Sequence, residues 1–244
     1  MRMSGNTILI TGGSSGIGMA LAERFLASGN TVIVCGRSGE ALKNVEARLP
    51  GLQCIVSDIG KPQEREALAR WVSAHFPALN VLINNAGIQR RLNLLDPEPW
   101  SATASEIDIN LGGPIHLTML LLPHLLRQPG AQIINVSSGL AFTPLAYAPV
   151  YCATKAAMHS FTLSLRYQLR DTSVRVSEII PPAVKTMLGG AHDFGAELDE
   201  FTDAIMTQLE AGAQEASFGT AAQRSRASRD ELDRWFEQMN GSMG

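Results

Sequence analysis

A tyrosine and a lysine stand four residues apart in the segment Tyr151-Cys-Ala-Thr-Lys155. If this segment is helical, the spacing places the phenol and the ammonium group on one face. A nearby cation favours the phenolate, so we expect Lys155 to lower the pKa of Tyr151 from its ordinary value of about 10 towards neutrality. Tyr151 would then act as a general acid and base. Such a pair also occurs on ordinary surface helices.

A serine pair precedes this segment and follows a predicted buried strand. The strand ends in Asn135-Val-Ser-Ser138, and Ser138 lies thirteen residues before Tyr151. In open α/β sheets the carboxyl ends of the strands form the ligand-binding edge. From there the Ser138 hydroxyl can donate to a substrate oxygen on which negative charge develops. The alternative is that Ser137 and Ser138 simply end the strand.

Near the N-terminus a glycine-rich loop stands between a predicted strand and a predicted helix. It is Thr11-Gly-Gly-Ser-Ser-Gly-Ile-Gly18, and a helical pattern follows from Met19 to Ala27. Glycines let the backbone turn sharply beside a phosphate, and the helix N-terminus offers free N–H groups. We expect a pyrophosphate site, although a glycine trio can also form an ordinary tight turn. The candidate cofactor-binding residues are Gly12, Ser14, Ser15, Gly16, Ile17 and Gly18.

The second predicted strand ends in Cys35-Gly36-Arg37-Ser38. In dinucleotide sites a carboxylate here binds the ribose 2′-hydroxyl, whereas a nearby arginine accommodates a 2′-phosphate. Gly36 stands in place of the acid, Arg37 can face a phosphate with two N–H groups, and Ser38 can add its hydroxyl. NADP (NADPH) is therefore predicted in preference to NAD. The alternative is that Arg37 is only solvated and Ser38 caps the next helix.

Two further strand ends carry candidate cofactor contacts. Asp58, after the third predicted strand, can accept a hydrogen bond from an adenine amine or cap its own loop. Asn85, Ala86 and Gly87 follow the fourth strand, where small residues leave room for a ribose and amides can tie neighbouring strands together. The alternative for these three residues is a plain turn.

Short β-branched runs alternate along the chain with helical patterns. This order is typical of parallel strands joined by right-handed crossovers, and the runs are apolar on both faces. The sequence predicts an α/β fold in one domain over residues 1–244, a Rossmann-like doubly wound parallel sheet with helices on both faces. Residues 189–219 lack strand periodicity, and we expect a substrate-binding flap at about 187–220 leading into a helix. The predicted strands are Thr7–Thr11, Thr31–Cys35, Gln53–Ser57, Val81–Asn84, Gln132–Val136 and Val174–Ile180.

The composition is that of a folded globular protein, with 45% apolar and 18% charged residues. A formal charge of -3 offers no basic surface for nucleic acid. Cys35, Cys54 and Cys152 indicate neither a disulfide framework nor a zinc site, so a reducing cytoplasm fits best. The short polar N-terminus shows no export signal, and the apolar stretch 111–126 is too short to span a membrane. The histidines lack metal-ligand spacing, so no catalytic metal is expected.

Together these motifs resemble the short-chain dehydrogenase/reductase family, over about residues 7–186. The resemblance implies a catalytic tetrad of Ser138, Tyr151, Lys155 and Asn110, the last in Asp-Ile-Asn110-Leu-Gly. It implies that Asn110 holds a water linking Lys155 to solvent. It also implies hydride transfer at nicotinamide C4 between a carbonyl and an alcohol. We expect the positive charge of the nicotinamide to add to the effect of Lys155 on the pKa of Tyr151. Without the resemblance, Asn110 is simply a polar residue at a helix bend.

The segment after the sixth predicted strand departs from the family pattern. It is Pro181-Pro182-Ala-Val184-Lys-Thr186, where the family usually has glycine at the second position. We expect this rigid turn to face the nicotinamide amide, with Pro181, Val184 and Thr186 as contacts. The Pro-Pro pair and the segment 226–232 resemble the branch named after the DltE oxidoreductase.

A small-molecule substrate is expected among mostly apolar side chains with two arginines nearby. These indicate a medium-sized hydrophobic alcohol or carbonyl compound, with room for an acidic group. The expected lining residues are Gln89, Arg90, Arg91, the Leu140–Tyr147 loop with Phe142 and Leu145, and Met187, Leu188 and Phe194.

The helix over Leu111–Leu126 is apolar almost all round. The resemblance favours a homodimer or homotetramer through this helix and the Tyr151 helix. No nucleic acid and no membrane partner is expected. The alternative function is non-catalytic, an NADP-binding redox sensor or interaction module.

Overall fold

The computed structural model describes residues 1–96, 99–190 and 193–241. Within these residues, seven strands form one sheet in the order β3-β2-β1-β4-β5-β6-β7, and all neighbours are parallel. The strand order reverses between β1 and β4, and at such a switch point the carboxyl ends of the strands open a crevice. The strands are β1 (Thr7–Thr11), β2 (Thr31–Gly36), β3 (Gln53–Val56), β4 (Leu79–Asn84), β5 (Gln132–Val136), β6 (Arg175–Ile180) and β7 (Glu215–Ser217).

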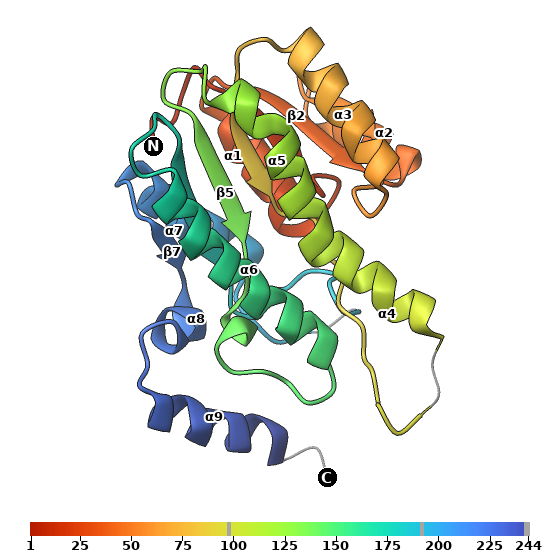
Figure 1. Ribbon diagram of the computed structural model, residues 1–244, viewed down its shortest axis with the longest axis vertical. Coiled ribbons are helices and arrows are strands. Elements are labelled where there is room, and N and C mark those ends of the chain that lie inside the picture. The colour runs from red at the N-terminus through yellow and green to blue at the C-terminus, as the bar shows by residue number, and fades with distance from the viewer. Residues whose placement is uncertain (97–98, 191–192, 242–244) are drawn as a thin grey trace.

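Helices cover both faces of this sheet (Figure 1). They are α1 (Gly16–Ala27), α2 (Gly39–Arg48), α3 (Pro62–His75), α4 (Trp100–Ile107), α5 (Gly113–Leu125), α6 (Pro149–Gln168), α7 (Leu198–Glu210), α8 (Gly219–Arg224) and α9 (Arg229–Gly241). On one face, α1, α2 and α7 pack around Phe25 and Phe201. On the other, α3, α5 and α6 pack around Val72 and Leu121. The predicted α/β, Rossmann-like sheet is confirmed.

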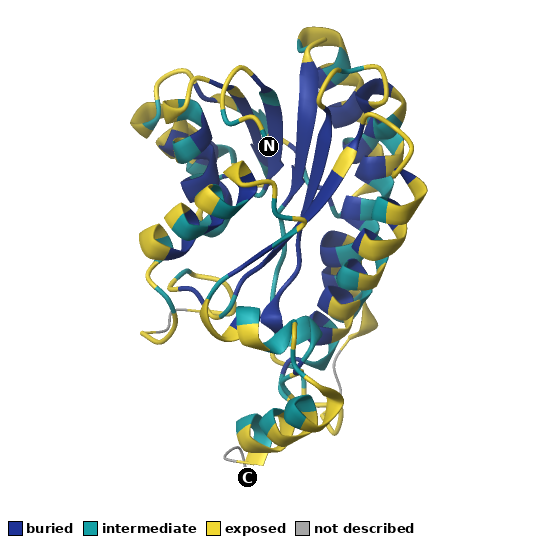
Figure 2. Cartoon of the chain, turned by 90° about the vertical axis from the view of Figure 1, so that its left-hand side faces the viewer, coloured by how far each residue is buried: buried dark blue, intermediate teal, exposed yellow. Residues whose placement is uncertain are grey.

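The core lies in two layers, one on each side of the central strands. Figure 2 shows the strands buried between helices whose outward faces are exposed. Every residue of β4 and β5 is buried, which explains why these segments are mostly apolar and do not alternate. Their buried amides pair with each other, since Asn84 donates to the Asn135 oxygen at 2.9 Å. The carboxyl ends of these strands are therefore held rigidly.

The region after β6 differs from the sequence-based expectation. Residues 189–219 show no strand periodicity, yet β7 lies there and pairs with β6 through Ile179 and Ala216. A strand of three residues is too short to leave a periodic pattern. Helix α7 also falls inside the predicted flap and packs against α1. Only the segment before it, 187–196, has the irregular backbone expected of a flap, and residues 191–192 lie outside the described part of the chain.

The apolar helix predicted over 111–126 begins with a π-helical turn. This turn, η1 (Asp108–Gly112), connects α4 to α5 and contains Asn110. Such turns insert an extra residue and often occur at functional sites. The predicted helix is present, and Asn110 lies in the π-helical turn that precedes it.

The last two helices form a separate layer at the end of the molecule (Figures 1 and 2). The Glu231 carboxylate accepts hydrogen bonds from the backbone N–H and the hydroxyl of Ser228, at 2.8 and 2.7 Å, and so caps the start of α9. Asn240 then fastens α9 to the loop before α6, because its side chain donates to the Pro144 carbonyl and accepts from the Ala146 N–H. None of the described helices is long and apolar enough to cross a membrane.

Candidate active site

The glycine loop joins β1 to α1 as predicted. Gly12 and Gly16 have φ angles of +68° and +53°, a region that side chains disfavour. No side chain caps the first turn of α1, so its N–H groups remain available to an anion. A Cβ at Gly18 would lie 2.4 Å from the Gly12 carbonyl oxygen. Gly18 therefore serves the close packing of helix on loop, and it does not line the cavity described below.

The end of β2 carries Arg37 at the rim of the site. Its side chain is exposed and lines the cavity, and Gly36 leaves this strand end without a carboxylate. The Ser38 hydroxyl accepts the Ala41 N–H at 3.1 Å, so Ser38 caps α2. The capping alternative for Ser38 thus holds, and Ser38 is absent from the cavity lining.

The ends of β3 and β4 bring their candidates to the same edge of the sheet. Asp58 lines the cavity and also accepts the Gly60 N–H at 2.9 Å, so its loop-capping role is present. The Asn85 amide donates to the Thr11 and Gly12 carbonyls at 2.9 and 3.2 Å. The predicted role of an amide in tying neighbouring strands is confirmed, because Asn85 links the end of β4 to the end of β1. The same hydrogen bonds fix the glycine loop relative to β4.

Ser138 and Tyr151 meet beyond the end of β5. The Ser138 oxygen accepts the Leu140 N–H at 3.1 Å, which leaves its own proton free to donate. Burial raises the pKa of Tyr151 above its ordinary value, and interaction with the Ser138 hydroxyl opposes that rise. The phenol is therefore held neutral in the protein.

Lys155 lies beneath Tyr151 on α6, fully inside the protein. Its ammonium nitrogen lies 5.6 Å from the centre of the Tyr151 ring and donates to the Val136 carbonyl at 2.8 Å. Burial lowers the pKa of Lys155 to about 8, and the Glu178 carboxylate opposes this effect. In the protein alone the pKa of Tyr151 is raised and not lowered as expected, because desolvation of the phenol is the largest effect on it. The expected contribution of the nicotinamide charge stays a prediction.

Asn110 is buried behind the two catalytic candidates. Its amide exchanges two 2.8 Å hydrogen bonds with the backbone of Ile88 and donates to the Thr154 hydroxyl at 3.2 Å. A Cβ on Gly87 would lie 3.3 Å from the Asn110 oxygen and 3.7 Å from the Lys155 nitrogen. Asn110 is thus close to Lys155, although it does not itself line the cavity.

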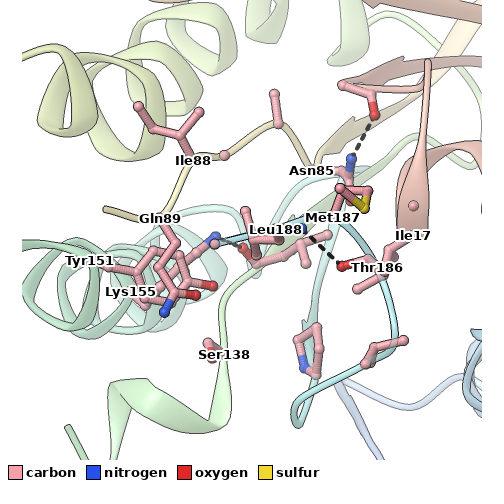
Figure 3. A pocket seen from close by; sticks show the side chains of 18 of the residues that line it. Ile17, Asn85, Ile88, Gln89, Ser138, Tyr151, Lys155, Thr186, Met187 and Leu188 are labelled. Atoms are coloured by element: carbon pink, nitrogen blue, oxygen red, sulfur yellow. Dashed lines mark hydrogen bonds between the residues drawn. The ribbon is translucent and has the colours of Figure 1, made fainter. Parts of the chain in front are cut away.

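One cavity of about 850 Å³ collects most of these residues. Figure 3 shows Tyr151, Lys155 and Ser138 at one end, with Ile17 and Thr186 at the other and Leu188 between. Of the expected substrate residues, Phe142 and Leu145 lie elsewhere. The predicted residues in its lining are Gly12, Ser14, Ser15, Gly16, Ile17, Arg37, Asp58, Asn85, Ala86, Gly87, Gln89, Arg90, Arg91, Ser138, Leu140, Tyr147, Tyr151, Lys155, Pro181, Val184, Thr186, Met187, Leu188 and Phe194.

Comparison with known proteins identifies this arrangement. The profile of the short chain dehydrogenase family matches residues 6–193. The chain belongs to this family. It is 46% identical to the uncharacterised oxidoreductase DltE of Bacillus subtilis, over 98% of each chain, and 32% identical to an uncharacterised oxidoreductase of Staphylococcus epidermidis, over 82% and 89%. The DltE-like resemblance is confirmed.

Solved structures of the short chain dehydrogenase family share the fold. One, from Burkholderia cenocepacia in complex with NADP, is 28% identical with a TM-score of 0.84, over 97% of this chain and 99% of that one. Another is a 3-ketoacyl-(acyl-carrier-protein) reductase from Brucella melitensis complexed with NADH. It is 25% identical with a TM-score of 0.81, over 90% and 100%. Structures with this fold are thus known in complex with NADP and with NADH.

The residues of this short chain dehydrogenase fit a dinucleotide. A Cβ on Gly12 would lie 2.8 Å from the Ala86 backbone, and one on Gly36 would lie 3.3 Å from the Ser14 hydroxyl. A Cβ on Gly16 would lie 3.4 Å from Thr186. Side chains at these positions would crowd the glycine loop against the ends of β2 and β4 and against the β6 turn, so glycine keeps the backbone accessible.

The Pro181-Pro182 turn keeps its place despite the departure from the family pattern. The Gly139 N–H donates to the Pro181 carbonyl at 2.8 Å, which ties the turn to the segment after Ser138. Val184 pairs as an isolated bridge with Ala196. Both prolines lie in the cavity lining, so the second proline is accommodated where the family has glycine.

Sequence reasoning missed several residues of this site. Thr220, Arg224 and Met239 reach the cavity from α8 and α9, outside the segment matched by the family profile. Nothing in their local pattern indicated this. Glu178, by contrast, is a charged residue within an apolar strand, and this signal was available. Glu178 is buried, and its two carboxylate oxygens lie 3.1 and 2.9 Å from Nδ1 of His159.

Proposed function

We propose that the chain is an NADP-dependent oxidoreductase that interconverts a carbonyl and an alcohol by hydride transfer. The observation that carries the proposal is the shared cavity, which is lined by the glycine loop and Arg37 as well as by Ser138, Tyr151 and Lys155. An anion-binding loop and a proton donor within one cavity are what such a reaction requires.

The end of β2 supports NADP over NAD. A ribose with two hydroxyls is usually bound by a carboxylate at this point, and Gly36 offers none. Arg37 extends into the cavity, where its guanidinium can pair with a 2′-phosphate through two N–H groups. The complexes known among relatives include both cofactors, so the preference for NADP rests on these two residues.

Tyr151 donates its phenolic proton to the substrate carbonyl oxygen. Because burial raises its pKa, the phenol is protonated at neutral pH and ready to donate. The Ser138 oxygen already accepts from Leu140, so its hydroxyl proton can stabilise the same substrate oxygen. When bound, NADPH supplies the hydride from nicotinamide C4. In the reverse direction the phenolate accepts the proton of the alcohol.

Lys155 and Asn110 stand behind the proton donor. The Lys155 ammonium lies close enough to stabilise the phenolate that Tyr151 leaves after donation. The Asn110 oxygen and the Lys155 nitrogen both lie beside Gly87, which supports the proposal that a water near them returns the proton. Asn110 is thus a positioning residue for the end of β4 and for that water.

We also propose a homodimer or homotetramer through α5 and α6. Both helices expose large apolar side chains, Met119 on the first and Leu163 and Tyr167 on the second. Light scattering at micromolar concentration is expected to give a dimer or tetramer. A monomer at all concentrations would contradict this arrangement.

The decisive experiment pairs cofactor binding with turnover. Purified protein is titrated with NADPH and with NADH by fluorescence and then screened against ketones, aldehydes and quinones with the tighter cofactor. Tighter binding of NADPH and turnover of a carbonyl compound are expected. Binding without any turnover would overturn the enzymatic assignment and favour a sensor, and tighter binding of NADH would overturn the cofactor assignment.

A further inference from the structure

The charge of the cavity is opposite to that of the chain. Among the described residues, its lining includes five cationic side chains, Arg37, Arg90, Arg91, Lys155 and Arg224, and one carboxylate, Asp58. The whole chain, by contrast, has 23 acidic and 20 basic residues. Walls of one sign raise the local concentration of ligands of the other sign.

A dinucleotide accounts for only part of this charge. Arg37 and Asp58 lie at the ends of β2 and β3, and Lys155 belongs to the catalytic group. Three arginines remain in the substrate part of the cavity. The Arg91 guanidinium lies over the Tyr147 ring, 4.6 Å from its centre, which is a cation–π contact.

Arg224 has different partners from Arg24 and Arg166, two other partly buried arginines. Arg24 and Arg166 pair with carboxylates, at 2.7 Å to Asp199 and 3.6 Å to Glu215. Within the described residues, no carboxylate lies at ion-pair distance from Arg224, and its guanidinium donates a hydrogen bond to the Met239 sulfur, at 2.9 Å. Sulfur is a weak acceptor. Burial lowers the pKa of Arg224, and no nearby charge opposes that effect.

The fold directs Arg224 towards the catalytic end of the cavity. Helix α8 packs on the segment after Ser138, since a Cβ on Gly139 would lie 3.1 Å from that of Ala221. Arg224 follows Ala221 by three residues and so shares its face of the helix. Asn240 holds α9 against the adjacent loop, which keeps Met239 beside the guanidinium.

We propose that the substrate is an apolar carbonyl compound or alcohol that carries a carboxylate, and that Arg224 binds this carboxylate. The inference rests on the proposed oxidoreductase function and specifies its substrate class. A guanidinium matches a carboxylate with two parallel N–H donors, and a partly desolvated site strengthens that pairing. Leu140, Met187 and Leu188 supply the apolar part of the same lining.

The test uses pairs of apolar oxo acids and their methyl esters as substrates with NADPH. Wild type is expected to favour the acids, and Arg224→Met is expected to lower kcat/KM for the acids by about 10–100-fold while leaving the esters nearly unchanged. Arg226→Met is the matched control, because Arg226 lies two residues away, is exposed and is absent from the cavity lining. Arg224→Gln repeats the test if the methionine variant folds poorly.

Binding of the oxo acids to the protein saturated with oxidised NADP, measured by calorimetry, separates the two proposals. If these acids bind wild type but not Arg224→Met and no compound is turned over, the carboxylate site stands and the proposed reaction fails. If esters are turned over as well as acids and Arg224→Met changes neither, the carboxylate inference is overturned and the reaction stands. Absence of both binding and turnover for every acid also overturns the inference.

Discussion

The ammonium nitrogen of Lys155 lies 5.6 Å from the centre of the Tyr151 ring, and both side chains are buried. Burial raises the pKa of the phenol and lowers that of the ammonium to about 8. Each group is thus less stable when charged than it would be in water. When Tyr151 gives up its proton, the phenolate and the ammonium group attract each other. The proposed reaction needs this stabilisation of the phenolate at the same step.

Lys155→Met is expected to make the protein more stable and inactive. A pKa lowered from 10.5 to about 8 corresponds to a cost of about 3 kcal/mol, and losing the hydrogen bond to Val136 offsets about 1 kcal/mol of the gain. The free energy of unfolding of this variant, measured with urea at neutral pH, should be about 2 kcal/mol higher than that of wild type. The cost is fully present below the folded pKa of about 8 and disappears as the pH approaches 10.5, so the gain should shrink over that range. An equal gain at all pH values would contradict this explanation.

Tyr151→Phe is expected to retain NADPH binding and to lose turnover. The substitution removes the proton donor and leaves the ring packed, so the rate should fall by about 10²–10⁴-fold. Fluorescence titration checks the binding, and single-turnover kinetics check the chemical step. Turnover at the normal rate in this variant would rule out the proposed role of the phenol.

Arg37→Ala is expected to weaken NADPH binding by about 10–100-fold and to leave NADH binding unchanged, because one charge-assisted contact to a 2′-phosphate is lost. Both dissociation constants are measured side by side. Arg48→Ala serves as the control, since Arg48 is an exposed arginine at the other end of α2. An equal loss for both cofactors would remove the argument for a 2′-phosphate site.

The His159–Glu178 pair is expected to make stability depend on pH. The Glu178 carboxylate raises the pKa of His159, with Glu215 adding to this effect and burial and Arg166 opposing it. A raised histidine pKa gives stability that is fully present below about 6.5 and is lost as the pH rises through the folded value.

His159→Leu should lower the free energy of unfolding by about 3 kcal/mol at mildly acidic pH, because it leaves Glu178 buried without its partner. The loss should diminish towards alkaline pH. His75→Gln, at an exposed position on α3, is the control. A loss that does not vary with pH would show that packing alone is responsible.

The parts of the site that lie close together in the chain could be predicted from the sequence. The loop from Gly12 to Gly18 joins one strand directly to one helix, and Tyr151 and Lys155 lie one helical turn apart. In both cases local backbone geometry sets the arrangement. The strands β4 and β5 were also recognisable, because a strand buried on both faces is mostly apolar and does not alternate.

The tertiary structure decided what depends on distant segments. Arg224 and Met239 enter the cavity because α8 packs on Gly139 and Asn240 holds α9 to the loop before α6. The charge state of Tyr151 also follows from burial, which a four-residue spacing cannot report. Local spacing determined which groups could react, whereas desolvation and long-range packing determined their pKa values and which other residues share the cavity with them.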